Sequence, residues 1–516
     1  MQITFYGAVE TVTGSCFKLT TESGYNILID CGLFQGPAQI KERNYGEFPF
    51  RPTEIDVVIL THAHIDHSGL IPKLYKKGYK KNVVTTNVTK DLCSIMLPDA
   101  AHIQEMEVER KNRKLARADK PLLEPIYNIE DAEKCIHKFI GVNYDEKTEI
   151  LPGVNVVFKD AGHILGSAMI ELYVDGKKVV FSGDIGKIDQ PIINDPSQIE
   201  QADFLIMEST YGNRFHLETE DKLVQLARII KKTMKKGGNL VIPAFAIERT
   251  QDLIYDLRKL IQDGEIPRVD VYIDSPLAIR ATEIFCRYPQ FFDEEASQMN
   301  GEGDACIFNF PGLKFSLTSE ESKNLNLVKN NAIIISASGM CDAGRIKHHL
   351  KHNLWRKEST ILFVGYQAQG TLGRRILEGE KLVKIHGEEV AVNAEIEKIE
   401  GFSAHADQTA LVEWVKKFQV KPQTIFLVHG ESDSTATLAH ILEEETGNRV
   451  IIPKINESFN LADEGDVIKP GTEEITDSIQ STFSNIQAKV EELLNKSYSK
   501  EDILSELERI KNNLLK

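Results

Sequence analysis

Residues 61–69 read Thr-His-Ala-His-Ile-Asp-His-Ser-Gly and follow directly on the apolar run Val57–Leu60. Three histidines and one aspartate fall within six residues, at the exit of a predicted buried strand. Imidazole and carboxylate groups are good ligands for zinc and similar divalent ions. The stretch therefore predicts a metal site built where a strand opens into a loop.

The spacing inside this stretch indicates how the ligands divide. Side chains two residues apart in an extended chain point to the same side, so His62 and His64 can face one ion. Asp66 and His67 follow where the chain turns, and we expect them to reach a second ion close by. A solvated polar loop is the alternative, and the density of the cluster argues against it.

The composition is that of a globular protein with room for two or three domains. The chain has 516 residues, of which 41% are hydrophobic and 27% charged. It shows no signal-like N-terminal segment and no long apolar run, so we expect no membrane span. Its seven scattered cysteines include no Cys-x-x-Cys pair. We expect reduced thiols in a cytoplasmic protein rather than disulfides or a cysteine–zinc site.

Charge excludes one class of function. A net charge of -16 argues against a protein that coats nucleic acid non-specifically, although it permits a local basic groove. Residues 341–375 hold seven Lys/Arg against two acids, and a second basic run lies at residues 110–117. Each run is either a phosphate-binding surface or a solvated helix face.

The chain divides into four stretches by pattern. Residues 1–207 alternate short apolar strands with Gly/Asp/Asn turns, which favours two packed sheets with outer helices. Residues 208–375 show longer strand–helix units, typical of a parallel α/β domain. Short strands return over 376–466, so the middle stretch is interpreted as an insertion. Residues 467–516 carry an apolar helical stripe, which predicts a helical extension that packs on its own body or supports a homodimer.

The pattern His-x-His-x-Asp-His resembles the metal signature of the metallo-β-lactamase superfamily. That resemblance implies a later His, then an Asp, then a final His, each at a strand exit. His163, Asp184 and His429 meet this expectation, because each follows an apolar run and has a glycine beside it. Asp30, which ends the apolar run 25–29, is interpreted as a carboxylate that orients a ligand histidine from behind. A plain turn residue is the alternative for Asp30.

Further stretches resemble the β-CASP branch of that superfamily, and in particular the prokaryotic relatives of the cleavage-and-polyadenylation endonuclease subunit. They lie at residues 207–212, 243–251, 336–340 and 401–407. The resemblance implies an α/β fold: a metallo-β-lactamase αββα sandwich (1–207 and 376–466) with an inserted β-CASP parallel α/β domain (208–375) and a C-terminal helical tail (467–516). It also assigns Glu208, His405 and His429 to the branch's motifs. A final histidine, as at 429, goes with RNA rather than DNA substrates in this branch.

The resemblance completes a two-metal site. His62, His64 and His163 are predicted to hold one zinc, Asp66, His67 and His429 the other, and Asp184 to bridge the two. Two ions a few ångströms apart suit displacement at phosphorus, and manganese fits such ligands as well as zinc. We assign catalytic roles to Asp66, Glu208 and His405. His405 would protonate the leaving oxygen, and Glu208 would fix the tautomer of His405.

Three residues are predicted to bind substrate. The amides around Ser338 lie between a predicted strand and helix, where they can cradle a phosphate. Arg249 begins a predicted helix and could clamp a phosphate with both ends of its guanidinium. Tyr211 either stacks on a base or simply lines the cleft.

These assignments predict a zinc-dependent ribonuclease for single-stranded RNA, endonucleolytic and with 5′–3′ exonuclease action left open. A small-molecule metallo-hydrolase is one alternative, and the large insertion with its basic helices argues against it. An inactive scaffold of an RNA-processing complex is another, and the full ligand set argues against it. A DNA nuclease is disfavoured by His429.

Overall fold

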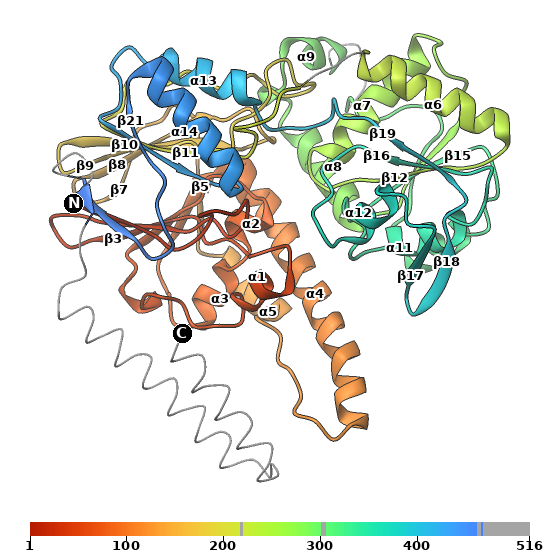
Figure 1. The fold of residues 1–516 in the computed structure, drawn as a ribbon, viewed down its shortest axis with the longest axis horizontal. Coiled ribbons are helices and arrows are strands. Elements are labelled where there is room, and N and C mark those ends of the chain that lie inside the picture. Colours follow the sequence, from red (N-terminus) through yellow and green to blue (C-terminus); the bar gives the residue numbers. More distant parts are fainter. Residues whose placement is uncertain (217–219, 301–305, 462–465, 468–516) are drawn as a thin grey trace.

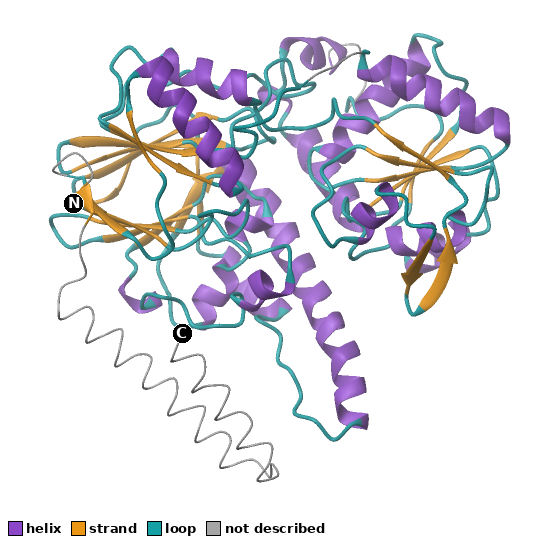
Figure 2. Cartoon of the chain, in the orientation of Figure 1, coloured by secondary structure: helices purple, strands orange, loops and turns teal. Residues whose placement is uncertain are grey.

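A computed structural model describes residues 1–216, 220–300, 306–461 and 466–467. Two lobes lie side by side (Figure 1), one built from both ends of the described chain and the other from its middle. Figure 2 shows a pair of sheets in the first lobe and a single central sheet in the second. The predicted helical tail falls almost entirely outside the described residues.

The first lobe is a sandwich of two sheets. One has eight strands in the order β23-β22-β1-β2-β3-β4-β5-β6, and they are β1 Gln2–Phe5, β2 Phe17–Thr20, β3 Asn26–Ile29, β4 Val57–Ile59, β5 Val83–Thr86, β6 Phe139–Val142, β22 Ser458–Asn460 and β23 Asp466–Val467. The other has seven in the order β21-β20-β11-β10-β9-β8-β7, and they are β7 Thr148–Leu151, β8 Val154–Asp160, β9 Ala168–Val174, β10 Lys177–Phe181, β11 Phe204–Glu208, β20 Thr424–Val428 and β21 Arg449–Ile451.

Aromatic rings from both sheets fill the space between them. Phe5 of the first sheet lies 5.4 Å from Phe426 of the second, measured between ring centroids. Phe17 of the first sheet stacks on Phe181 of the second. These side chains are almost fully buried, and burying rings of this size is the main source of stability in such a core.

Helices cover the outer faces of both sheets. The first sheet and its connections carry α1 Ala38–Glu42, the short helix η1 Pro52–Glu54, α2 Ile65–Ser68, α3 Ile71–Lys76, α4 Asn87–Arg117 and α5 Ile129–Ile136. The second sheet is covered by α13 Gln408–Lys416 and α14 Ser432–Thr446, through an apolar cluster that includes Trp414 and Leu438. The lobe therefore has four layers, helix–sheet–sheet–helix, which confirms this part of the predicted fold class.

The second lobe is a parallel α/β unit. Its six strands run in the order β14-β13-β15-β12-β16-β19, and they are β12 Leu240–Pro243, β13 Asp270–Ile273, β14 Leu313–Phe315, β15 Ala332–Ser336, β16 Thr360–Phe363 and β19 Glu395–Lys398. Every neighbouring pair is parallel. The remaining elements are α6 Lys222–Lys236, α7 Arg249–Gln262, α8 Pro276–Arg287, η2 Pro289–Phe291, α9 Glu294–Asn300, α10 Ser319–Leu325, α11 Ile346–Asn353, α12 Leu372–Leu377 and the hairpin β17 Leu382–Ile385 with β18 Glu388–Ala391.

The bounds of the inserted unit stay a prediction. The position of β19 is relevant to the C-terminal bound. This strand pairs with β16 along its full length, so residues 395–398 belong to the parallel sheet. We propose that the inserted unit extends to about residue 398 rather than ending at 375. The pattern of short strands beyond 375 resembles that of the first lobe, and a strand's own residues do not reveal which sheet it joins.

One expectation about cysteine is wrong. Cys286 of α8 and Cys306 form a disulfide, with their Cα atoms 5.3 Å apart. The other five cysteines are buried thiols, as expected. The two partners stand 20 residues apart in no recognisable pattern, and only the fold brings them together. Among the described helices none is long and apolar enough to cross a membrane.

Asp274 connects the elements at the carboxyl edge of the inserted sheet. Its buried carboxylate accepts hydrogen bonds from Ser322 Oγ (2.6 Å) and Arg345 (2.7 Å), and lies 2.6 Å from Nε2 of His349. These partners replace the water that the charge loses. Burial opposes the charge, but the bonds from His349 and Ser322 outweigh it and lower the pKa of Asp274 to about 2.

We expect Asp274→Asn to destabilise the protein by about 3 kcal/mol at neutral pH, because Arg345 and His349 lose the charge that they face. A depressed carboxyl pKa contributes stability above the unfolded value of about 3.9 and loses it as the pH falls toward 2. The gap between wild type and variant in thermal unfolding midpoint, followed by circular dichroism, should therefore shrink between pH 4 and pH 2. Asp270→Asn, at an exposed ion pair on β13, the strand that precedes Asp274, is the control; equal midpoints for wild type and Asp274→Asn at pH 7 would contradict the prediction.

Candidate metal centre

The first motif occupies the exit of β4 and the start of α2. His62 is fully buried, His64 is the residue before α2, and Asp66 and His67 lie within that helix. Neighbouring loops hold the turn closely: Ser15 N donates to Asp66 O, and Cys31 N donates to His67 O. A Cβ on Gly32 would lie 1.6 Å from Asp66 O, so this approach requires glycine.

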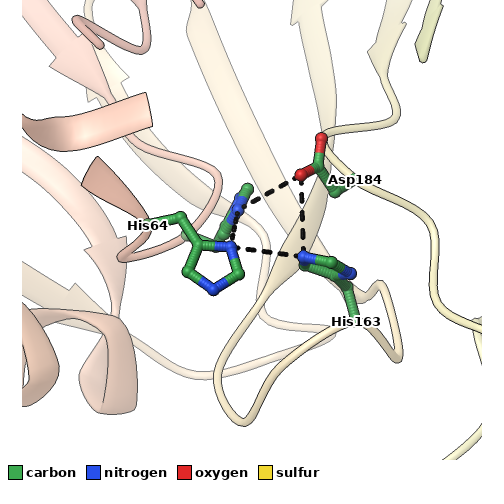
Figure 3. Close-up of side chains that lie close together, drawn as sticks. His64, His163 and Asp184 are labelled. Carbon is green, nitrogen blue, oxygen red and sulfur yellow. Dashed lines mark hydrogen bonds and ion pairs between the residues drawn. The ribbon is translucent and has the colours of Figure 1, made fainter. Parts of the chain in front are cut away.

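Three imidazoles and one carboxylate form the first ligand group. Nδ1 of His64 lies 3.1 Å from Nε2 of His62 and 3.3 Å from Nε2 of His163. Oδ2 of Asp184 lies 3.6 Å from Nε2 of His62 and 3.6 Å from Nε2 of His163. Figure 3 shows His64, His163 and Asp184 converging on one point. Ligands about 2.0–2.1 Å from a tetrahedral zinc stand about 3.3 Å apart, so the group fits a divalent ion.

The protonation of these imidazoles suits a metal. Burial is the largest influence and lowers the pKa of His62 and His163 well below the ordinary histidine value. It lowers the pKa of His64 to about 4. All three rings are therefore neutral near pH 7, and the neutral ring is the form that binds metal ions.

The second group shares the same aspartate. Nε2 of His67 lies 3.3 Å from Nε2 of His429 and 3.4 Å from Oδ1 of Asp184. Nε2 of His429 lies 3.7 Å from Oδ2 of Asp66. One oxygen of Asp184 thus faces each group, and the buried Oδ1 accepts no hydrogen bond in the described structure. An orphaned buried oxygen between imidazoles is what a bridging metal ligand leaves behind.

Asp30 stands behind His67, where it was predicted to orient a ligand. Its Oδ2 lies 2.7 Å from Nδ1 of His67. It also accepts hydrogen bonds from Ser15 Oγ and from the amide and hydroxyl of Thr61. Burial opposes a charge on His67, but Asp184 and Asp30 outweigh it and raise the pKa of His67 well above its ordinary value. The contact leaves Nε2 of His67 to face the second group.

Glu208 and His405 form a third cluster beside Asp184. Glu208 ends β11, is fully buried, and accepts a hydrogen bond from the amide of Ile185. Its Oε2 lies 3.3 Å from Nδ1 of His405. Burial opposes a charge on His405, but the carboxylates of Glu208, Asp184 and Asp66 raise the pKa of His405 to about 9. His405 is therefore a protonated imidazole next to the metal groups.

Two contacts were not predicted from the sequence. Oγ1 of Thr210 lies 3.1 Å from Nδ1 of His429, so it holds this ring from the side away from Asp66. Nε2 of His216 lies 2.8 Å from the carbonyl of His405. Thr210 lies two residues after Glu208, which was a usable signal; nothing in the sequence around His216 indicated its role.

The three residues predicted to bind substrate have different surroundings in the structure. The ring of Tyr211 lies 5.8 Å from that of His405, and the guanidinium of Arg214 lies over the Tyr211 ring, 5.4 Å from its centroid. Ser338 donates its hydroxyl to the carbonyl of Ala343 within its own loop. Arg249 is buried, paired with Asp252 at 3.0 Å, and lines an interlobe cavity of about 300 Å³. A phosphate-binding role for these residues stays a prediction.

Comparisons with known proteins agree with this geometry. Family models match residues 11–228 (metallo-β-lactamase superfamily), 250–376 (β-CASP domain) and 389–453 (Zn-dependent metallo-hydrolase RNA specificity domain). Ribonuclease TTHA0252 of Thermus thermophilus is 36% identical over 86% of this chain and 96% of its own length. The chain belongs to the β-CASP branch of the metallo-β-lactamase superfamily. As a member of this branch it is a metal-dependent hydrolase.

Other relatives of this β-CASP protein carry different names. An RNase J-like protein of Methanocaldococcus jannaschii is 32% identical over 84% of this chain and 94% of its own length. The transcription termination factor FttA of Methanosarcina mazei is 32% identical over 85% of this chain and 68% of its own length. A crystal structure of a protein of unknown function from Enterococcus faecalis V583 superposes with a TM-score of 0.50 at 14% identity, covering 90% of this chain and 99% of that chain, and supports the fold alone.

We expect Asp184→Ala to reduce the bound divalent metal from about two ions per chain to fewer than one, because both groups lose a ligand. His429→Ala should lose only the second ion. Metal content after gel filtration, by plasma mass spectrometry, measures both. Asp263→Ala, at an exposed position of the other lobe, should keep the wild-type content; the same content in Asp184→Ala would refute the shared site.

Proposed function

We propose that this β-CASP protein is a zinc-dependent ribonuclease that cuts single-stranded RNA. The observation that carries the proposal is the pair of ligand groups sharing Asp184, with a protonated His405 beside them. The family model for RNA specificity spans residues 389–453, which include His405 and His429. The ribonuclease from Thermus thermophilus, with which this chain aligns over most of its length, supports the same substrate.

The ligand set assigns the metals. His62, His64 and His163 would hold one ion, Asp66, His67 and His429 would hold the other, and Asp184 would serve both. When bound, two divalent ions polarise the phosphodiester and lower the pKa of a water between them. We propose zinc for both positions, and these nitrogen and oxygen ligands accept manganese as well. Asp66, itself a member of the second ligand group, also contributes to the charge that raises the pKa of His405.

The residues around His405 perform the proton transfer. Water adds to phosphorus and releases a proton to solvent, the bond from phosphorus to the departing sugar oxygen breaks, and that oxygen takes a proton from His405, which regains one from solvent. Because Nδ1 of His405 faces Glu208, Nε2 is the nitrogen available for the departing oxygen. Glu208 keeps this tautomer and balances the positive charge before the transfer.

We propose endonucleolytic cutting as the main activity, with 5′–3′ exonuclease action as a second mode. Both modes use the same hydrolytic step and the same residues. They differ only in whether the RNA threads through the cleft or stops with its 5′ end at the metals. A circular RNA has no end, so it separates the two modes.

A 5′-labelled linear RNA and a circular RNA of the same sequence should both be cut by the wild-type protein. Internal fragments from the linear RNA and linearisation of the circle would establish the endonuclease, whereas mononucleotides with an intact circle would leave only the exonuclease. The double variant His64→Ala/His405→Ala should cut neither. Metal-loaded wild-type protein that cuts neither RNA would sink the ribonuclease proposal in favour of a scaffold or a small-molecule hydrolase.

His405→Ala alone should slow cleavage by about 10²–10⁴-fold while bound metal stays unchanged, because a general acid contributes about that much. A general acid works only while protonated, so the wild-type rate should fall as the pH rises through about 9. This fall should be missing from the residual rate of the variant, measured under single turnover. His440→Ala removes an exposed histidine and is the control; an alkaline fall of equal size in His405→Ala would contradict the assignment.

A further inference from the structure

The loop between β12 and α7 makes an unusual turn just before the helix. Glu248 adopts φ 67° and ψ −64°, and the amide of Arg249 donates to the carbonyl of Ile247 at 3.0 Å. These values define a γ-turn of the rare, strained kind. A residue other than glycine in such a conformation costs about 1–3 kcal/mol and persists where a site depends on it.

The side chain of Glu248 crosses from the inserted lobe to the metal-binding lobe. Its Oε2 accepts a hydrogen bond of 2.8 Å from the amide of Leu165. Leu165 belongs to the loop between β8 and β9, two residues after His163. Glu248 and Leu165 are both buried, so water cannot take the place of either partner.

Leu165 differs from its neighbours in the source of its partner. The amides of His163 and Ile164 both donate to Oγ of Ser167, which lies in the same loop. The amide of Leu165 donates to Glu248 of the other lobe. The loop that carries His163 thus has hydrogen bonds within itself at His163 and Ile164, and a hydrogen bond to the inserted lobe at Leu165.

We propose that Glu248 is a positioning residue. Its hydrogen bond to Leu165 fixes the position of the His163 loop, and with it the geometry of the first metal group. The inference rests on the metal ligands assigned above and adds a residue of the inserted lobe that contacts no ligand directly. It explains why a buried acid and a strained turn occur together at this position.

Glu248 acts here as an acceptor rather than as a charge. Burial, followed by the nearby carboxylate of Asp252, raises the pKa of Glu248 well above the ordinary value. Its second oxygen, Oε1, has no hydrogen-bond partner in the described structure. A neutral carboxyl group with one oxygen on Leu165 is matched in shape and polarity by glutamine.

Three substitutions of Glu248 separate the effects of side-chain length, of the charge of the carboxyl group and of removing the side chain altogether. Glu248→Gln keeps the length and the acceptor oxygen. Glu248→Asp keeps the carboxyl group but falls short by one methylene. Glu248→Ala removes both. Asp252→Asn alters a buried acid one turn further along α7. This acid pairs with Arg249 rather than with the His163 loop in the described structure, so the variant is the matched control for lost stability.

Zinc affinity, measured by competition with a chromophoric chelator, is the main readout, and kcat and KM on RNA are the second. Glu248→Ala and Glu248→Asp should weaken the tighter-bound zinc by about 10-fold or more, the usual effect of removing a group that orients a metal ligand. KM should stay within about twofold and kcat should fall, because the metal rather than the RNA contact is displaced. Glu248→Gln should remain within about threefold of wild type.

Two outcomes would overturn the inference. Wild-type zinc affinity in Glu248→Asp would show that the loop needs no such support. An equal loss of zinc in Asp252→Asn, at an equal fall in thermal midpoint, would reduce the effect to general destabilisation. The zinc measurement requires no RNA. Weaker zinc in Glu248→Ala together with a wild-type protein that cuts no RNA would therefore reject the ribonuclease proposal and leave this inference standing.

Discussion

One buried carboxylate connects the functional parts of this molecule. Asp184 lies between two groups of imidazoles, with Oδ2 toward His62 and His163 and Oδ1 toward His67. A charge in such a place is costly unless cations or polarised donors surround it. Burial opposes the charge of Asp184, yet the surrounding histidines hold its pKa well below the ordinary value. Two divalent ions would supply the same compensation more strongly, and this explains why so many ligands converge there.

Several strands of the metal-binding lobe end close to Asp184. The first motif follows β4, Asp184 follows β10, Glu208 ends β11 and His429 follows β20, so the sandwich fixes these residues through its register rather than through long loops. β11 lies between β10 and β20 in the second sheet, which brings Glu208 between Asp184 and His429. The metal site and the proton donor therefore share one rigid edge. Rigid support of this kind is what a two-metal site requires, because small displacements of ligands cost much in activity.

The inserted lobe contributes structure as well as surface. Its parallel sheet is tied together at Asp274, and its β12–α7 turn reaches the His163 loop through Glu248. Arg249, predicted as a phosphate clamp, pairs with Asp252 and lines the cavity between the lobes, and its role in phosphate binding stays a prediction. The interface between the lobes is polar and strained at Glu248, which is expected where the two parts must act on the same substrate.

The sequence alone determined what local pattern can determine. The strand before the dense motif, the helix that begins at Arg249 and the strand before Ser338 depend on neighbouring residues. The structure has all three, as β4, α7 and β15. The later ligand candidates His163, Asp184 and His429 needed the family resemblance to join them into a set. Only the tertiary structure decided the sheet to which β19 belongs, the pairing of Cys286 with Cys306, and the contact of Glu248 with Leu165. Each of these is an encounter between segments distant in sequence or between lobes, and no periodicity or composition of a single segment records its partner.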